Sequence, residues 1–304
     1  MTPDVSVCIA TFRRPSGLAR LLDSLAKLKL PEGVILEIVV VDNDPAASAA
    51  HALAEWSAAP HVLRTFREPR ANVSHARNRG VAESRGRWLA FIDDDEVADE
   101  DWIAGFWRRL EVDGCDAWFG PVLPRLEEPG PAWLDPEVFF ARPRHPSGTC
   151  VGLGDARTSN AFVRRSLIDG LRFDPAHGCS EGHSEDTELF GRMLATGARF
   201  AWCDEAVVRE WIPAERNRIG WLSRRAFFGG VVWTRLVRAR EPVASLARDL
   251  PRAMIGFGAL ALALLPAALF GRGRVARVWL RLCVQAGHLR AFAGVGAVGY
   301  DEVA

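Results

Sequence analysis

The chain has 304 residues, 49% of them hydrophobic, and its 38 basic and 38 acidic side chains give a formal net charge of +0. This balance excludes a dedicated nucleic-acid-binding protein, which would carry a clear basic excess, so we expect no nucleic acid among its partners. The length and the hydrophobic content are sufficient for a complete core and favour one large domain with an appendage.

The six cysteines are scattered along the chain without a C-x-x-C pair. This spacing predicts free thiols in a reducing compartment. Residues 2–4 lead directly into an apolar run rather than into a signal peptide. We therefore expect the catalytic part of the protein to lie in the cytoplasm.

In chain order, the first hundred residues alternate between short apolar runs and helical patterns. A first helix is expected between Ser16, as its N-cap, and the breakers Pro31 and Gly33. Strands that are apolar throughout and alternate with helices predict an α/β fold, a Rossmann-like and mostly parallel sheet flanked by helices. The expected strands are 5–10, 34–41, 62–66 and 88–92, and the further helices are 46–58 and a helix that includes 78–84.

Polar side chains follow three of these predicted strands. Ligands of parallel α/β sheets bind beyond the carboxyl ends of the strands, so we expect these side chains to converge on one ligand crevice. They are Thr11, Arg13 and Arg14 after the first strand, Asp42, Asn43 and Asp44 after the second, and Asp93, Asp94, Asp95 and Glu96 after the strand at 88–92.

The acidic run 93–96 directly follows a buried strand, which holds its carboxylates rigidly. Asp93 and Asp95 face the same side if the strand geometry continues. Clustered carboxylates repel one another, and their hard oxygens suit Mg²⁺ or Mn²⁺, so the run predicts a divalent cation that in turn binds phosphates. The alternative is an acidic cap for the helix expected at 101–110.

Residues 119–154 are rich in Pro, Gly and Arg and lack clear periodicity, which favours loops around an acceptor site. A helix is expected from Ser184, its N-cap, to Thr196. Glu185 and Asp186 lie in its first turn, where acids interact favourably with the helix dipole by about 0.3–1 kcal/mol. Their position alone therefore fits either a dipole role or a catalytic role.

A local cluster of His177, Cys179 and His183 raises the possibility of zinc. The spacing matches no common zinc site and offers no obvious fourth ligand. A loop beside the acceptor pocket is the preferred interpretation.

The last part of the chain changes character. Residues 253–270 are uninterrupted apolar sequence with arginines on both sides, and 275–292 mix arginines with apolar residues. We expect the first segment to dip into a membrane or to lie in it, and the second to form an interfacial helix, with membrane lipids as partners. A buried helical hairpin is the alternative. The expected domains are therefore 1–240, catalytic, and 241–304, helical and membrane-associated.

Five segments of this sequence resemble the motifs of family 2 glycosyltransferases, in the same order. The resemblance covers roughly residues 5–235 and implies a GT-A fold, a nucleotide-sugar donor and inversion at the anomeric carbon. The segments are VSVCIATFRRP at 5–15, VVVDN at 39–43, ARNRG at 76–80, FIDDDE at 91–96 and SEDTEL at 184–189.

The resemblance also implies site residues. Asp186 is implied as the general base, with Glu185 beside it, and Asp93 and Asp95 as ligands of the metal that bridges the diphosphate. The donor-binding residues that it implies are Thr11 and Arg13 at the base and ribose, Asp42 at the base, Arg77 at the base or phosphates, Asp93 near the ribose, Asn78 and Asp94 toward the nucleotide-sugar, and Asn160 near the donor sugar or the acceptor.

Physical chemistry supports these roles independently. A nucleoside diphosphate needs no general acid to leave if a metal neutralises its growing charge. The acceptor hydroxyl needs a base, and one carboxylate about 2.6–3.2 Å away is sufficient. This sequence departs from many relatives at 207–211, which contain no histidine, so Arg209, Arg216 or Arg218 is expected to supply positive charge instead.

The sequence therefore predicts an inverting glycosyltransferase at the cytoplasmic face of the inner membrane. It would transfer a sugar, with a UDP-sugar as the first choice of donor, to a glycan or lipid-linked saccharide in surface polysaccharide biosynthesis. One alternative is a noncatalytic membrane-bound protein that binds nucleotide-sugar or carbohydrate. Another is a nucleotidyltransferase, for which the first strand should lead into a Gly-rich phosphate loop, and residues 10–14 do not form one.

Overall fold

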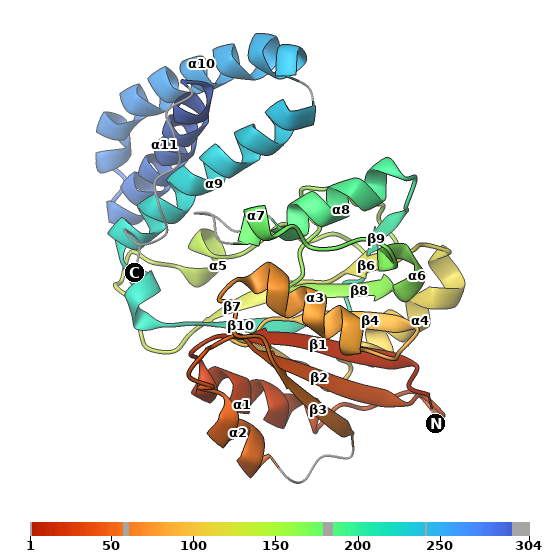
Figure 1. The fold of residues 1–304 in the computed structure, drawn as a ribbon. Helices are drawn as coiled ribbons and strands as arrows, with labels where there is room; N and C mark the ends of the chain where they lie inside the picture. Colours follow the sequence, from red (N-terminus) through yellow and green to blue (C-terminus); the bar gives the residue numbers. More distant parts are fainter. Residues whose placement is uncertain (1, 57–60, 179–184, 241, 294–304) are drawn as a thin grey trace. The chain divides into compact units, whose positions relative to one another are not determined.

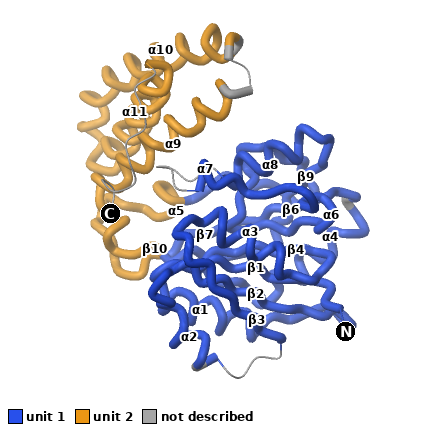
Figure 2. The backbone as a smooth tube through the Cα atoms, viewed as in Figure 1, with its two compact units in different colours: residues 1–125, 141–179, 185–211 blue, residues 126–140, 180–184, 212–304 orange. Residues whose placement is uncertain are grey.

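A computed structural model describes residues 2–56, 61–178, 185–240 and 242–293 of the chain (Figure 1). The chain divides into two compact units (Figure 2). The first unit comprises 1–125, 141–179 and 185–211, and the second comprises 126–140, 180–184 and 212–304. Helix α9 therefore groups with the C-terminal helices, whereas the sequence places the domain boundary after residue 240.

The described part of the first unit contains a seven-stranded sheet in the order β3-β2-β1-β4-β8-β6-β9. Neighbouring strands from β3 to β4 are parallel, β8 is antiparallel to β4 and β6, and β9 is parallel to β6. The mostly parallel sheet predicted from the sequence is confirmed. The strands are β1 (Val5–Thr11), β2 (Leu36–Asp42), β3 (Val62–Arg67), β4 (Trp88–Ile92), β6 (Ala117–Phe119), β8 (Asn160–Arg164) and β9 (Phe200–Trp202).

Both faces of this sheet are covered (Figure 1), and alternate residues of the central strands enter different cores. Val7 and its neighbour Ala90 pack with α1 and α4, whereas Cys8 and its neighbour Phe91 pack with α3 and α8. The helices of this unit are α1 (Pro15–Leu25), α2 (Ala50–Glu55), α3 (Val73–Glu83), α4 (Trp102–Asp113), α6 (Arg165–Ile168), α7 (Pro175–Gly178) and α8 (Glu185–Ala195). A smaller sheet orders its strands β5-β10-β7, from β5 (Glu96–Ala98), β10 (Val208–Ile212) and β7 (Val122–Leu126).

Several helices begin or end at other residues than the sequence predicts, for reasons of local chemistry. The expected N-cap Ser16 is wrong: α1 begins at Pro15, whose fixed φ suits the first helical position, and no side chain caps the helix. Helix α3, of which the sequence predicted only the part at 78–84, begins at Val73, where the Asn72 side chain accepts a 2.8 Å hydrogen bond from the Ser74 amide. Helix α2 is shorter than the expected 46–58. The predicted cap of α8, Ser184, lies outside the described residues.

The second unit is mainly helical. Its small core is made by Leu134, Phe140, Ile212 and Leu222. Helix α11 packs along both α9 and α10 (Figure 1). The elements are α5 (Pro136–Phe139), the 3-10 helix η1 (Ala214–Asn217), α9 (Ile219–Arg240), α10 (Pro242–Ala268) and α11 (Arg272–Phe292).

Candidate active site

The carboxyl ends of β1, β2 and β4 meet at one edge of the sheet, as the sequence predicts. Thr11 and Asp42 are register partners, and the Asn43 amide donates to the Thr11 carbonyl at 2.9 Å. Strand β4 lies on the other side of β1, so the acidic run that follows it enters the same edge. The three groups of polar residues are therefore neighbours in space.

Asp94 connects the turn after β1 to the acidic run by hydrogen bonds. Its Oδ2 accepts from Thr11 Oγ1 at 2.8 Å and from the Phe12 amide at 3.3 Å, and its Oδ1 accepts from Arg14 at 2.9 Å. Burial raises the pKa of Asp94, and the Arg14 guanidinium opposes that rise. Gly17 permits this approach, because a Cβ there would lie 2.5 Å from the Asp94 carbonyl oxygen.

Asp95 lies among other carboxylates. Its Oδ2 accepts a 3.0 Å hydrogen bond from Arg14 Nη1, and its side chain is 16% exposed. Burial raises the pKa of Asp95 to about 6; Asp93 and Glu210 add to the rise by repulsion, while Arg14 lowers it. Burial and carboxylate repulsion together therefore outweigh the attraction of Arg14.

Arg77 connects this acidic run to helix α8. From α3, its Nη2 donates to Asp93 Oδ1 at 3.1 Å and its Nη1 donates to Glu185 Oε1, 108 residues away along the chain. The Glu185 side chain is only 2% exposed, and among the described residues its Oε2 has no hydrogen-bond partner. Burial raises the pKa of Glu185, whereas Arg77 lowers it.

Asp186 lies beside the start of β8. Its Oδ1 accepts from the Thr187 amide at 2.6 Å, and its Oδ2 accepts a longer bond, 3.4 Å, from the Thr158 amide. Thr158 also lines a pocket together with Arg77 and Asp93. Asp186 is therefore linked through Thr158 to the pocket that Arg77 and Asp93 line.

Arg142 is a site residue that the sequence analysis missed. It donates to the Ser159 hydroxyl and, at 3.3 Å, to Glu210. Burial lowers the pKa of Arg142, but attraction to the carboxylates raises it overall. These carboxylates are Glu210, Glu96, Asp93 and Asp186. Its only sequence signal was its place in the Arg-rich segment 119–154, because no motif includes it.

The side chains of other predicted site residues form hydrogen bonds with the backbone. Asn160 accepts from Trp102 Nε1 at 2.8 Å and donates to two carbonyls, and Asn78 forms two 2.8 Å bonds with the backbone of Phe173. Asp42 accepts from two amides of the loop that follows it. Arg13 is exposed and lies 3.5 Å from Asp44. Their ligand contacts stay predictions.

The remaining expectations have mixed outcomes. The acidic run does not cap α4: its last residue, Glu96, begins β5, and no side chain caps α4. Arg209, expected as spare positive charge, pairs with Asp99. Cys179 and His183 of the zinc alternative lie outside the described residues, and within the described ranges no three His, Cys, Asp or Glu side chains form a ready metal site.

The sheet with its strand-end carboxylates, bridged to an acidic helix start, defines a GT-A-type glycosyltransferase. The family model described as glycosyl transferase family 2 matches residues 6–172, and the chain belongs to this family. It is 35% identical over 241 residues to the succinoglycan biosynthesis protein ExoM of Rhizobium meliloti (strain 1021), covering 77% of this chain and 74% of that protein. It is 33% identical to ExoO of the same organism, over 66% of this chain and 58% of that one.

Two solved structures share the fold. S. aureus TarS 1-349 in complex with UDP has a TM-score of 0.53 and 14% identity, and covers 96% of this chain and 92% of that one. The mannosyltransferase PcManGT from Pyrobaculum calidifontis, in complex with GDP-Man and Mn²⁺, has a TM-score of 0.54 and 18% identity, and covers 100% and 79%. The family makes this protein a glycosyltransferase, and not a nucleotidyltransferase or a noncatalytic binding protein.

Proposed function

We propose that the protein transfers a sugar, with inversion, from a nucleoside diphosphate sugar to a saccharide or lipid-linked saccharide in surface polysaccharide biosynthesis. The observation that carries this proposal is the bridge from Arg77 to Asp93 and Glu185, because it joins the donor end of the site to the helix of the expected base. The names of the two succinoglycan relatives support the polysaccharide. The UDP bound to TarS supports a UDP-sugar as the first donor to test.

In this proposal Asp186 is the base. The acceptor oxygen bonds to the anomeric carbon, the bond from that carbon to the diphosphate oxygen breaks, and the hydroxyl proton passes to the Asp186 carboxylate. The Thr158 and Thr187 amides fix the direction of that carboxylate. Glu185 acts through Arg77, which it holds in place beside Asp93, and is therefore a positioning residue.

A divalent cation fits the acidic run. Asp93 and Glu210 each repel Asp95, and Arg14 already places one cationic group against Asp94 and Asp95. Mg²⁺ or Mn²⁺ would be held by Asp93 and Asp95, whose carboxylate oxygens are the ligand type that both metals prefer. When bound, the cation would neutralise charge on the leaving diphosphate. The Mn²⁺ in the PcManGT complex supports this choice.

The proposed location is the cytoplasmic face of the inner membrane, with bilayer lipids as partners. Among the described residues, one helix is long and apolar enough to cross a membrane, at Ser245–Ala268. A lipid-linked acceptor would be presented at such a surface.

A donor screen tests the proposal. Purified protein is incubated with UDP-, GDP- and dTDP-sugars plus Mn²⁺, Mg²⁺ or EDTA, and release of the nucleoside diphosphate is measured. We expect release from one nucleotide class, above all a UDP-sugar, with loss of activity in EDTA. Arg79→Ala, an exposed change on the same helix as Arg77, should behave like the parent. No release from any donor would contradict the proposed reaction, and full activity in EDTA would contradict the metal.

A further inference from the structure

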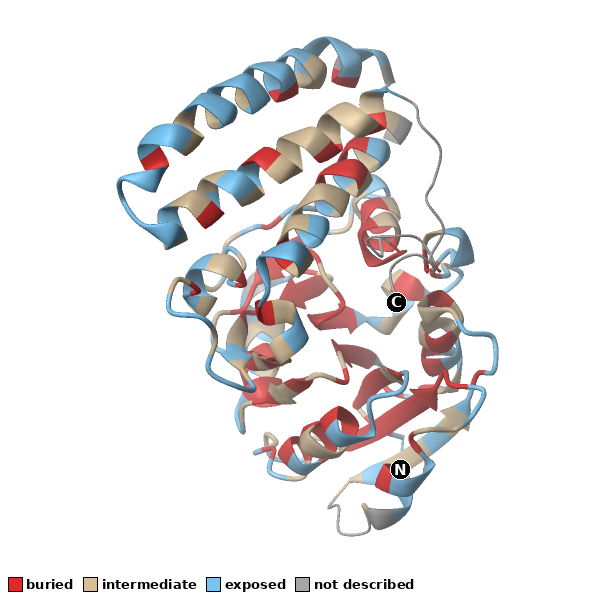
Figure 3. Ribbon diagram, turned by 90° about the vertical axis from the view of Figure 1, so that its left-hand side faces the viewer, coloured by how far each residue is buried: buried red, intermediate tan, exposed pale blue. Residues whose placement is uncertain are grey.

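Much of helix α10 is exposed (Figure 3), and its exposed positions include large apolar residues. Leu262 and Leu265 near its C-terminal end are 78% and 82% exposed, and Leu269, the residue directly after its end, is 84% exposed. The buried positions are small instead, such as Ala253 and Ala267. A helix of a water-soluble protein shows the opposite pattern, with its apolar stripe toward the core. The outer face of α10 therefore needs an apolar environment.

The inner face of α10 is already occupied. Helix α11 packs along it, and Gly256 lies so close that a Cβ there would come within 3.2 Å of the Gln285 side chain. Helix α11 in turn packs against α9, and the Thr234 hydroxyl oxygen of α9 lies 2.7 Å from Nδ1 of His288 on α11. A Cβ on Gly287 would clash with the Phe227 carbonyl of α9. Helices α9, α11 and α10 therefore pack tightly against one another, and α10 is the outer helix.

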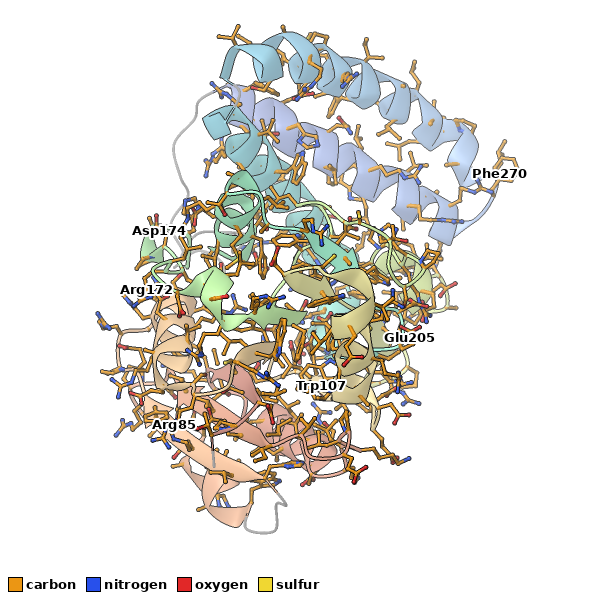
Figure 4. The ribbon with its side chains drawn as sticks, turned by 90° about the vertical axis from the view of Figure 1, so that its right-hand side faces the viewer. Arg85, Trp107, Arg172, Asp174, Glu205 and Phe270 are labelled. Atoms are coloured by element: carbon orange, nitrogen blue, oxygen red, sulfur yellow. The ribbon has the colours of Figure 1, made fainter. Side chains whose placement is uncertain are left out.

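Beyond Asp249, which lies 3.8 Å from Arg252, the charge of α10 and α11 has one sign. From Leu250 to Ala293 the chain has no acidic residue and six arginines: Arg252, Arg272, Arg274, Arg277, Arg281 and Arg290. The Arg252 side chain is 73% exposed, and the Arg274 guanidinium stacks 5.6 Å from the ring of Phe270. Phe270 itself lies at the tip of the hairpin (Figure 4). Arginines beside an apolar face are complementary to a surface of anionic lipid headgroups.

We propose that α10 lies in the plane of an anionic bilayer surface without crossing it. Its outer face, marked by Leu262, Leu265 and Leu269, enters the boundary between headgroups and acyl chains, and α11 stays on the aqueous side. The inference rests on the membrane location given under the proposed function and specifies how that location is reached. It makes the protein monotopic, with both ends of α10 on the same side of the membrane.

The packing of α11 opposes a span, although Ser245–Ala268 is long enough to cross. Helix α11 packs along α10, so a crossing would carry Arg277 and Arg281 into the lipid interior. Charged side chains there are costly and rare.

Cysteine labelling tests the topology. The full chain with Arg272→Cys, at the turn between α10 and α11, is expressed in cells, and inside-out membrane vesicles are treated with a membrane-impermeant maleimide. The native Cys150, which is exposed on the first unit, is the internal reference. Mass spectrometry measures the two sites separately. We expect both to be labelled from the cytoplasmic side. Labelling of Arg272→Cys only from the opposite side would overturn the proposal in favour of a span.

Vesicle flotation tests the outer face. The parent should float with phosphatidylcholine vesicles that contain phosphatidylglycerol, and less with phosphatidylcholine alone. Leu262→Ser/Leu265→Ser should lower the bound fraction about tenfold or more, because two leucines no longer enter the lipid. Val112→Ser, which changes a 71% exposed residue on α4, is the matched control and should float like the parent.

The other outcomes are equally decisive. Undiminished flotation of the double variant would overturn the assignment of the outer face. A parent that forms a dimer in lipid-free buffer and never floats would identify a second copy of the chain as the partner of this face. That result removes the membrane location too, while the donor screen still decides the proposed reaction separately.

Discussion

Removal of the Arg77 side chain tests the bridge on which the site depends. Arg77→Ala leaves Glu185 buried at 2% exposure without its cationic partner, and it releases Asp93. Removing one partner of a buried ion pair costs about 3–5 kcal/mol when the remaining charge stays ionised. We therefore expect a large loss of stability of the first unit and a loss of transfer activity.

The size of that loss should depend on pH. Burial already raises the pKa of Glu185 and Arg77 lowers it, so without Arg77 this pKa rises further. Between the pKa of Glu185 in the unfolded chain and its higher pKa in the folded variant, the folded variant keeps a proton on Glu185 that the unfolded chain has released. The stability of the variant therefore falls as pH rises through this range. With Glu185 neutral, the cost is about 1–3 kcal/mol for a buried polar group. We expect about 2 kcal/mol at pH 6 and about 1–2 kcal/mol more at pH 8.

Urea denaturation followed by tryptophan fluorescence measures this effect at both pH values. Arg79→Ala, whose ion pair with Glu83 is exposed, is the matched control and should cost under about 1 kcal/mol. In a Glu185→Gln background the pH dependence of the Arg77→Ala loss should disappear. A loss equal to that of Arg79→Ala, or one with no pH dependence in the parent background, would refute the reasoning.

Three further predictions concern the site. Asp186→Asn should lower kcat by about 10²–10⁴-fold because the acceptor proton has no base, while the donor Kd measured by calorimetry stays unchanged; unchanged turnover removes Asp186 as the base. Transfer activity should fall as pH decreases through about 6, because protonation of Asp95 removes a metal ligand. Added Mn²⁺ should shift this fall in the pH–activity profile to lower pH, since the metal competes with the proton. A profile that Mn²⁺ does not shift would show that Asp95 does not bind the metal. Gly17→Ala places a Cβ 2.5 Å from the Asp94 carbonyl oxygen and should cost about 1–3 kcal/mol of unfolding free energy, measured by urea denaturation; no measurable loss would show that the turn adjusts freely.

The sequence was most informative where a residue's environment depends on regular local patterns. The strands at 88–92 and, apart from Ser6, at 5–10 are apolar because they are buried on both faces, and the structure places β4 and β1 there. The convergence of Thr11, Asp42 and the acidic run follows directly from a parallel sheet, since strand ends share one edge.

Contacts between distant segments were beyond sequence reasoning. The pairing of Arg142 with Glu210 depends on the path of loops that have no periodicity, so no spacing rule reaches it. Asn160 is buried among three protein partners, which a motif that suggests a ligand cannot reveal. The start of α1 at Pro15 depended on a choice between two acceptable first positions, and the proline's fixed φ decided it.

The most direct test of the central claim is a crystal structure with UDP and Mn²⁺ that locates the metal by its anomalous scattering. The account predicts one anomalous peak in contact with a carboxylate oxygen of Asp93 or Asp95, with the diphosphate beside it and the uracil near Thr11. A nucleotide bound at another edge of the sheet, with no metal at these carboxylates, would contradict it.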